Sequence, residues 1–257
     1  MKILLSNNRS GPAWTDPDLT NPHMVEDKAR RVEQMFAAIA PSYDLNNRLH
    51  SLGRDQAWRR AAVRMAQVNQ DDIVLDVACG TGDLTAAFVD SATGSPRRVL
   101  GVDFTMEMLK LARGKRDGRL ISYQRGDAMR LPVEDCSVDV VSIAFGIRNV
   151  TEPMLVMEEF YRVLRPGGRV LILEFSTPTN RYFQALYGVY FKYIMPRTAT
   201  LIARDPTGAY KYLPKSVNTF LDRTALVKMI EDSGFVEVQM KPLTFGISIC
   251  YRAVKKR

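Results

Sequence analysis

Cysteine and histidine are scarce in this chain, which holds three cysteines and two histidines among its 257 residues. The cysteines, Cys79, Cys136 and Cys250, lie far apart and are odd in number, which excludes a disulfide framework and favours a reducing compartment. No cluster of His, Cys and Asp has the spacing of metal ligands, so we expect no metal.

Long apolar runs are absent as well. No stretch of about eighteen apolar residues occurs, which excludes a membrane-spanning helix. The apolar start 1–5 gives way at once to the polar residues 6–8, which excludes the apolar core of a secretory signal. We therefore expect a cytoplasmic protein.

Overall composition is that of a folded protein, with 46% hydrophobic and 25% charged residues. The length suits one sizeable α/β domain, or at most two small ones. The net charge of +8 fits nucleic acid, an anionic bilayer or no particular partner. Because most of the basic residues are scattered and we find no RNA-binding module, we expect no nucleic acid, and a nucleic-acid-binding protein is kept only as an alternative of another class.

Strand and helix patterns alternate through the middle of the chain, which is typical of a parallel, doubly wound sheet. The strands 236–240 and 247–254 are joined by a link too short for a crossover helix, so this last pair is antiparallel. The sequence therefore predicts a seven-stranded, mostly parallel sheet with an antiparallel last strand. The other predicted strands are 73–77, 99–103, 120–124, 138–143 and 169–175, and the predicted helices are 83–89, 106–112, 153–163 and 223–232.

The residues before the first predicted strand predict additional parts of the molecule. Residues 1–24 are rich in Pro, Asn, Asp and Thr and predict a flexible N-terminal arm. Residues 25–257 then form a single domain, whose segment 25–70 is an N-terminal helical cap. In this cap we expect a helix over 25–40, a loop over 42–54 and a helix over 55–66.

An insertion over 176–220 is too long for a plain connection. Six aromatic residues occur from Tyr182 to Tyr193 inclusive, and apolar residues surround the helix almost completely. Two interpretations stay open for this segment: an extra packed helix, or a lid on the substrate side that covers an apolar ligand.

Small residues follow the first predicted strand. Asp76 lies near the end of this strand, and Gly80, Thr81 and Gly82 let a ligand approach the backbone at the carboxyl end of the sheet. A dinucleotide-binding fingerprint needs a third glycine at position 85, where Thr85 stands. This difference counts against a pyrophosphate cofactor.

Carboxylates follow the next two strands. Asp103 stands where an aspartate accepts both ribose hydroxyls of an adenosine, although it also suits a turn or the cap of a helix that begins near Thr105. Asp127, followed by Ala128, can accept from an adenine amino group while a backbone N–H meets a ring nitrogen. A loop aspartate without a ligand is the alternative.

These pieces, in this order, resemble class I methyltransferases. Other segments are similar to one group more narrowly, the ubiquinone/menaquinone biosynthesis C-methyltransferase family, and the resemblance covers about residues 32–254. Those segments are 43–47 with Ser51 and Trp58, 144–150, 162–168 followed by 173–176, and 196–197 with 210–213 in the family's lid region. The family usually has methionine where Asn46 stands and histidine where Asp55 stands, and both positions lie on the substrate side.

The resemblance implies a Rossmann-like class I fold and methyl transfer from S-adenosyl-L-methionine to a ring carbon of a demethylated prenyl quinol. Demethylmenaquinol is the first expectation, and the ubiquinol precursor, another apolar phenol, or a cofactor-binding protein that has lost catalysis are the alternatives. The cofactor-binding candidates are Asp76, Gly80, Thr81, Gly82, Asp103, Asp127 and Ala128.

Methylation at carbon requires that the adjacent hydroxyl of the quinol lose its proton. This step needs a base, directly or through one water, and donors for the developing phenolate. Arg148 and Asn149 can hold the phenolate or a base water, and Tyr43 can cover the cofactor or donate to the quinol. A salt bridge of Arg148 and a capping role of Asn149 are the alternatives. We interpret His50 as a surface residue and Cys79 as a packing residue.

A prenyl quinol partitions into the bilayer, which bears on the aromatic insertion. Arg181, Lys192 and Arg197 accompany its aromatic rings. Aromatic rings with basic neighbours predict transient, peripheral contact with an anionic membrane surface. The oligomeric state is left open, with a homodimer among the options.

Overall fold

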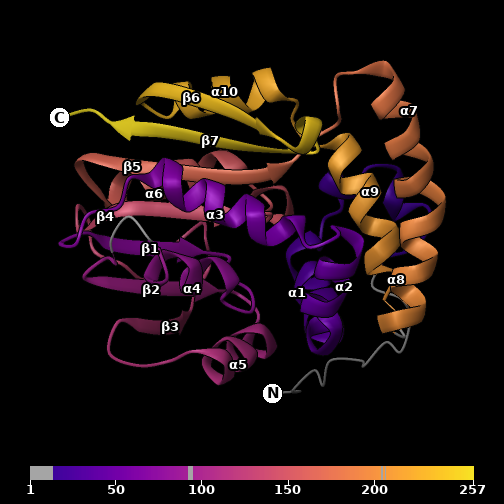
Figure 1. The fold of residues 1–257 in the computed structure, drawn as a ribbon, viewed down its shortest axis with the longest axis horizontal. Helices are drawn as coiled ribbons and strands as arrows, with labels where there is room; N and C mark the ends of the chain where they lie inside the picture. Colours follow the sequence, from indigo (N-terminus) through magenta and orange to yellow (C-terminus); the bar gives the residue numbers. More distant parts are fainter. Residues whose placement is uncertain (1–13, 92–94, 204, 206) are drawn as a thin grey trace, which may run out of the picture.

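The computed structural model describes residues 14–91, 95–203, 205 and 207–257. In this part of the chain seven strands form one sheet, in the order β3-β2-β1-β4-β5-β7-β6 (Figure 1). The first five strands pair in parallel, and β7 runs antiparallel to both β5 and β6. The predicted sheet is therefore confirmed. The strands are β1 (Ile73–Val77), β2 (Arg98–Asp103), β3 (Ile121–Arg125), β4 (Val138–Ala144), β5 (Leu164–Phe175), β6 (Phe235–Leu243) and β7 (Ser248–Lys255).

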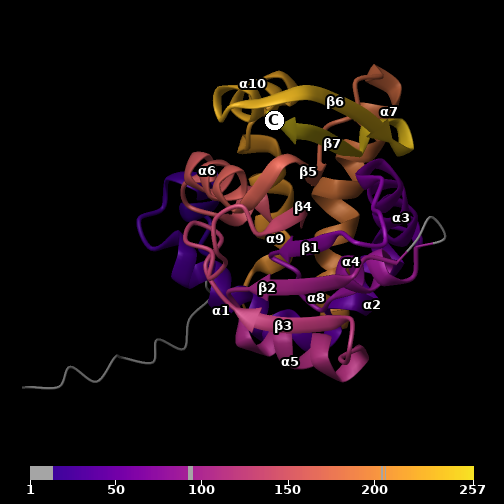
Figure 2. The same ribbon diagram turned by 90° about the vertical axis from the view of Figure 1, so that its left-hand side faces the viewer.

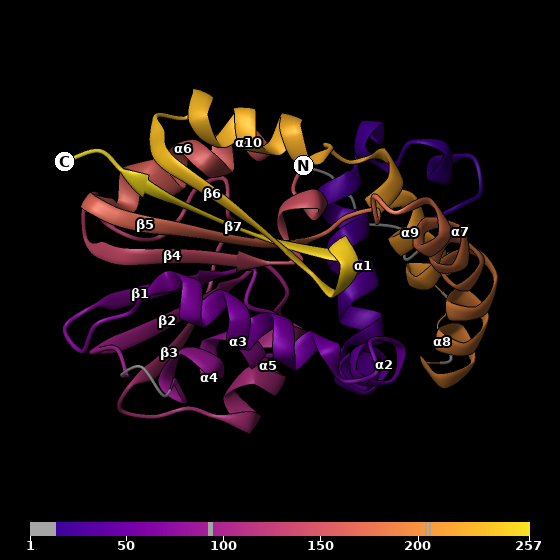
Figure 3. The ribbon, with the colours of Figure 1, turned by 45° about the horizontal axis from the view of Figure 1, so that its top comes forward.

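Helices cover both faces of this sheet, as Figures 2 and 3 show. The central strands are apolar on both sides, so alternate residues such as Val74 and Leu75 join separate hydrophobic clusters. The first face carries α3 (Arg54–Ala66), α4 (Asp83–Val89) and α5 (Met106–Lys115), and the second carries α6 (Pro153–Val163) and α10 (Arg223–Asp232).

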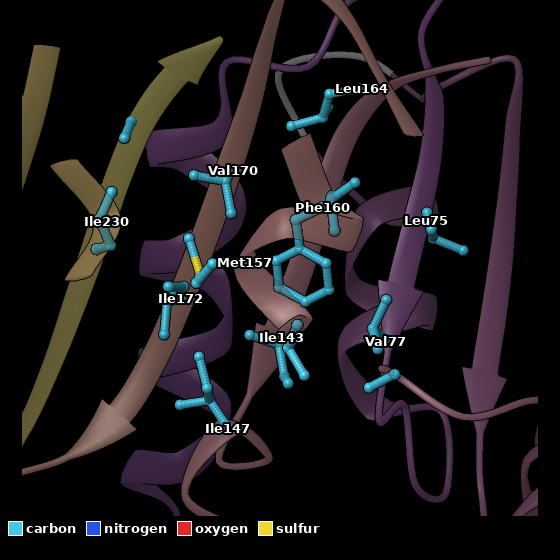
Figure 4. Packing of buried hydrophobic residues seen from close by; sticks show 14 of the residues in the cluster. Leu75, Val77, Ile143, Ile147, Met157, Phe160, Leu164, Val170, Ile172 and Ile230 are labelled. Carbon is cyan, nitrogen blue, oxygen red and sulfur yellow. The ribbon is translucent and has the colours of Figure 1, made fainter. Parts of the chain in front are cut away.

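The core of the second face shows how a helix is fixed to the sheet. Met157 and Phe160 project from α6 into a cluster that includes Val170 and Ile172 of β5 and Ile143 of β4 (Figure 4). These side chains are almost completely buried. Burying one side chain of this kind contributes about 1.5–3 kcal/mol to stability, so the sheet provides a rigid base for the loops at its edge.

A helical cap lies beyond the carboxyl ends of the parallel strands (Figure 1). It combines two segments that are far apart in sequence, because Met35 and Ile39 share a hydrophobic cluster with Phe191, Met195 and Tyr210. The cap consists of α1 (Lys28–Ile39), α2 (Tyr43–His50), α7 (Arg181–Val189), a π-helical segment (Tyr190–Ile194), α8 (Met195–Ala203) and α9 (Ala209–Thr219).

The predicted loop over 42–54 is wrong, because α2 occupies most of it. Pro41 does end α1, but it stands inside a short 3₁₀ turn, Ala40–Ser42, that leads directly into α2. Proline is tolerated there because a first helical turn needs no hydrogen bond from its N–H. Strand β5 also begins earlier than predicted, at Leu164, and passes through an irregularity opposite β4.

The described part of the predicted N-terminal arm is packed against the cap. Trp14 and Leu19 are buried, and the Trp14 ring stacks on the Tyr212 ring with centroids 4.4 Å apart. Residues 14–24 are therefore not a loose arm, and residues 1–13 lie outside the described residues. Among the described helices, none has both the length and the apolar character needed to cross a membrane.

Candidate functional site

Two cavities adjoin where the sheet meets the cap. The smaller, of about 120 Å³, is lined by residues that follow β1, β2 and β3, and the larger, of about 380 Å³, lies among the cap helices and α3. Phe36, Tyr43 and Phe145 line both cavities. Molecules held in the two cavities would therefore meet at these three side chains.

The turns after β1 and β4 have an unusual backbone. Ala78 has a φ of 50° and Phe145 a φ of 58°, in the left-handed region that costs a non-glycine residue about 1–2 kcal/mol. A side chain at Gly146 would place its Cβ 2.7 Å from that of Ala78, so glycine is required for the two turns to approach. Backbone strain of this kind concentrates at functional sites.

Asp103 connects the glycine loop to the turn after β2. Its Oδ2 accepts the N–H of Gly80 at 2.8 Å, and its Oδ1 accepts the N–H of Thr105 at 2.8 Å. Burial raises the pKa of this carboxyl, and the backbone hydrogen bonds oppose that shift. The turn contact that was the alternative thus exists, without a side-chain cap on α5, and Asp103 also lines the smaller cavity. A carboxylate has about four acceptor positions, so capacity is left for ribose hydroxyls.

Asp127 and Ala128 line the same cavity. The Oδ1 of Asp127 accepts the N–H of Met129 at 2.9 Å, which fixes the carboxylate at the cavity wall. Phe104, Met108 and Met129 supply apolar walls beside it. A flat base between apolar walls, with carboxylates for its amino group and its ribose, fits this set of residues, so the cavity suits an adenosine.

Three of the predicted cofactor-binding residues shape the loop rather than line the described cavities. Asp76 is buried behind the loop, where its oxygens accept the hydroxyls of Thr85 at 2.6 Å and Ser142 at 2.7 Å. Burial raises the pKa of Asp76 to about 6. These contacts use the Asp76 carboxylate to hold β1, β4 and α4 together, and a role of Asp76 in cofactor binding stays a prediction.

The other two residues are Thr81 and Gly82. Thr81 donates its hydroxyl to Asp44 at 2.7 Å, which ties the loop to α2. Gly82 precedes α4 with a φ of 79°, and a Cβ there would lie 2.5 Å from the hydroxyl oxygen of Tyr123. Spacing along the chain identifies this loop but does not distinguish the residues that face a ligand from those that support it.

Arg148 lines the larger cavity. Its Nη1 donates to the carbonyl of Phe145 at 2.6 Å and to Glu174 Oε1 at 2.7 Å, and its guanidinium lies 5.3 Å from the centroid of the Phe175 ring. Burial raises the pKa of Glu174, and the charge of Arg148 opposes that shift. Arg148 Nε is buried without a hydrogen-bond partner among the described residues. The salt bridge and the position at the cavity therefore occur together.

Asn149 and Tyr43 lie at the junction of the cavities. Asn149 lines the smaller one, donates to the carbonyl of Phe145 at 3.2 Å and accepts the hydroxyl of Tyr212 at 3.0 Å. Tyr43 lines both cavities, and burial raises the pKa of its phenol. Tyr43 is therefore a neutral hydroxyl at physiological pH, able to donate.

The sequence analysis placed Asn46 and Asp55 on the substrate side but did not name Arg59, which also lines the larger cavity. Asp55 and Arg59 form a buried ion pair of 3.0 Å, and the Arg59 guanidinium lies 5.5 Å from the centroid of the Phe145 ring. The sequence signal for this wall is that its lining residues recur every three or four positions along α2 and into α3. The further lining residues include Asn46, Asn47, Trp58, Phe175, Tyr187, Tyr190, Tyr210 and Tyr212.

The surroundings of His50 and Cys79 can also be compared with the predictions. His50 was predicted at the surface, but it is half-buried and lines the larger cavity, with Nε2 2.8 Å from the hydroxyl of Thr198. Burial raises the pKa of Cys79 well above its usual value, so this residue is a protonated thiol packed against the core. Within the described residues, no group of three His, Cys, Asp or Glu side chains is arranged to hold a metal ion.

Comparison with known proteins gives consistent matches over most of the chain. The model of the ubiE/COQ5 methyltransferase family matches residues 24–255. The demethylmenaquinone methyltransferase of Deinococcus radiodurans is 43% identical over 225 residues, which are 87% of this chain and 92% of that protein. The ubiquinone/menaquinone biosynthesis C-methyltransferase UbiE of a Geobacter species is 41% identical over 91% of this chain and all of its own length.

Solved structures share the fold at lower identity. A SAM-dependent methyltransferase of Thermotoga maritima superposes with a TM-score of 0.60 at 17% identity, over 88% of this chain and all of that one. Phosphoethanolamine N-methyltransferase 2 of Haemonchus contortus, solved with S-adenosyl-L-methionine, has a TM-score of 0.54 at 15% identity, over 76% of this chain and 51% of its own. The architecture of these methyltransferases is therefore the one found in this chain.

Proposed function

The chain belongs to the ubiE/COQ5 methyltransferase family, and on this premise we propose that it transfers the methyl group of S-adenosyl-L-methionine to a ring carbon of demethylmenaquinol. The observation that carries this proposal is the pair of adjoining cavities, one suited to an adenosine and one large and aromatic, that share Phe36, Tyr43 and Phe145. The ubiquinol precursor is the alternative substrate, because one similar relative is named for both quinones.

The residues of the two cavities divide the work. Bound S-adenosyl-L-methionine supplies an electrophilic methyl group, so the protein must mainly align the acceptor carbon with it. Asp103, Asp127 and Ala128 would hold the adenosine in the smaller cavity. The aromatic walls of the larger cavity would hold the quinol ring with its face toward the shared residues and exclude water.

Arg148 would stabilise the phenolate that makes the ring carbon nucleophilic. Its Nε points to no protein partner among the described residues, and a fixed cation in an apolar cavity stabilises developing negative charge more strongly than water does. Asn149 and Tyr43 stand beside it, where they can orient a base water or donate to the second oxygen.

The membrane would be the source of the substrate. Leu52 lines the larger cavity and is 89% exposed, and Tyr182 and Leu201 of the cap are 88% and 80% exposed. Exposed apolar side chains on the cap, one of them on the lining of the larger cavity, with Arg181 and Arg197 nearby in sequence, suit transient contact with an anionic bilayer. We extend the proposal to this peripheral contact.

An assay with purified protein tests the proposed function. Methyl incorporation from labelled S-adenosyl-L-methionine is measured under anaerobic conditions with demethylmenaquinol, the ubiquinol precursor and a panel of short phenols. We expect the highest kcat/KM for demethylmenaquinol. Equal rates on all three classes would contradict the proposal. A preference for the ubiquinol precursor would make that compound, and not demethylmenaquinol, the substrate.

A further inference from the structure

An unpaired hydrogen-bond acceptor lies on the wall of the larger cavity. Asn46, on α2, is 2% exposed, and it lines the cavity one helical turn after Tyr43. Its Nδ2 donates to the carbonyl of Ser42 at 3.2 Å, whereas its Oδ1 has no hydrogen-bond partner among the described residues. Buried polar atoms are almost always paired, so an unpaired one beside a cavity points to a ligand.

The orientation of this amide is determined by its neighbour. If the two ends were exchanged, the Asn46 oxygen would face the carbonyl oxygen of Ser42, and two acceptors cannot form a hydrogen bond. The nitrogen therefore faces Ser42, and the group left free is the acceptor. A ligand atom that pairs with it must carry a hydrogen.

The polar side chain one turn further along the helix, His50, does not supply this hydrogen. The Nδ1 of His50 lies 2.9 Å from the backbone carbonyl of Asn46, and its Nε2 lies 2.8 Å from the Thr198 hydroxyl. The other unpaired side-chain atoms on this cavity include the Nε groups of Arg59 and Arg148, which are donors. Another is the hydroxyl oxygen of Tyr210, which can donate or accept. Among the unpaired side-chain atoms of the described residues that line this cavity, Asn46 Oδ1 is therefore the one that can only accept.

This combination distinguishes the two oxidation states of a quinone ring. A quinol carries hydroxyls, so one oxygen can lose its proton beside a guanidinium while the other donates to an acceptor. A quinone carries only acceptor oxygens, and against Asn46 Oδ1 it would leave two acceptors facing each other. An unpaired polar group in a site of this kind gives strong discrimination.

We propose that Asn46 is a specificity-determining residue that selects the reduced ring, by accepting a hydrogen bond from the hydroxyl that only the quinol has. This role rests on the proposed function, because it takes the larger cavity as the quinol site.

Binding of two small probes tests the proposal without turnover. The dissociation constants of tail-less 1,4-naphthoquinol and 1,4-naphthoquinone are measured anaerobically by titration calorimetry with the full chain. We expect the wild-type protein to bind the quinol at least tenfold more tightly than the quinone. Asn46→Leu, which keeps the side-chain shape, should bring the two dissociation constants within threefold of each other, mainly by weakening the binding of the quinol.

Two further variants keep the outcome clear. Asn46→Met, which suits a helix, should behave like Asn46→Leu and replaces it if that protein does not fold. Asn218→Leu makes the same change at an exposed position of α9 and should keep the wild-type ratio. An unchanged ratio in the Asn46 variants would overturn the role of Asn46 alone. If the wild-type protein binds neither probe, the quinol site and the role of Asn46 are both overturned.

Discussion

Arg148 Nη1 donates a hydrogen bond of 2.7 Å to Glu174 Oε1, and both side chains are buried at the carboxyl ends of the paired strands β4 and β5. The Arg148 guanidinium lies over the Phe175 ring, and Arg148 and Phe175 both line the larger cavity. A buried ion pair holds its members in one geometry, and removing one partner leaves an uncompensated charge. The pair therefore fixes the guanidinium where a phenolate would form.

Substitution of Arg148 separates chemistry from stability. We expect Arg148→Lys to lower turnover by roughly a hundredfold, because a point ammonium lacks the planar fork and a lost charge-stabilising donor costs about that factor. The affinity for S-adenosyl-L-methionine, measured by calorimetry, should change little. Normal turnover together with a lowered melting temperature would make Arg148 a structural ion-pair partner. Arg148→Ala is a poorer test, since burying Glu174 alone costs about 3–5 kcal/mol.

Asp103 should control cofactor affinity. Asp103→Ala would remove the two hydrogen bonds that the ribose hydroxyls donate to the charged carboxylate, each worth about 1.5–3 kcal/mol. The affinity for S-adenosyl-L-methionine should therefore fall by roughly a hundredfold or more. Because Asp103 also holds Gly80 and Thr105, Asp103→Asn keeps the shape and serves as the milder variant. Asp117→Asn, at an exposed position, is the matched control. Unchanged affinity in a folded Asp103→Ala protein would remove this residue from the site.

Asp76 should make stability depend on pH. Its folded-state pKa of about 6 lies above the ordinary value of 3.8, so between these pH values the folded state binds a proton that the unfolded state lacks. The free energy of unfolding should therefore fall by about 3 kcal/mol as pH rises from about 4 to about 6, and then level off. Asp76→Asn should lack this fall, whereas the exposed control Asp71→Asn should keep it. Urea unfolding between pH 4 and 7 measures the difference, and parallel curves for wild type and Asp76→Asn would contradict it.

The cap aromatics should matter most for substrates with a long tail. The rings of Tyr187 and Phe191 stack with centroids 4.9 Å apart and line the larger cavity. Replacing both with serine should raise the KM for a long-tailed quinol more than for a tail-less analogue. Leu155→Ser, on α6 and outside the described lining, is the control. An equal rise in KM on both substrates would mean that these side chains act only in packing the core.

Contact with a bilayer should be weak and charge-dependent. The protein should sediment with anionic liposomes more than with neutral ones, and less as salt rises, because ions screen exposed charges over about 10 Å at 0.1 M. Leu52→Asp with Leu201→Asp should reduce sedimentation, while Leu155→Asp, on α6 at the sheet, should not. Sedimentation that ignores lipid charge and these substitutions would argue against a membrane-facing cap.

Local patterns were sufficient for the elements that pack directly on the sheet. The prediction of β1, α4, α6 and α10 agrees with the structure to the residue. In each case the apolar side chains that produce the periodicity are those that the sheet buries, and the ends carry chain-local signals. Pro153 begins α6, and Asp222 caps α10 by accepting the N–H of Ala225 at 2.8 Å.

The sequence did not reveal α2, and the reason is physical. Its inner face carries Tyr43, Asn46, Asn47 and His50, which line a cavity instead of a core, so the spacing is helical while the side chains are mostly polar. Hydrophobic periodicity detects a helix by the apolar surface it buries. A helix whose inner face lines a ligand cavity buries little apolar surface, so it gives little of that signal.

By itself, the sequence determined the order of strands and helices, the glycine loop with its following carboxylates, and the family motifs, because these depend on residues close together in the chain. Only the tertiary structure decided which side chains face the cavities. It turned the Asp76 carboxylate toward Thr85 and Ser142, and it brought Arg148 to Glu174 across 26 positions through the pairing of β4 with β5. It also joined two distant helical segments into one cap. Such contacts depend on how the sheet places distant residues side by side, and no local spacing encodes that placement.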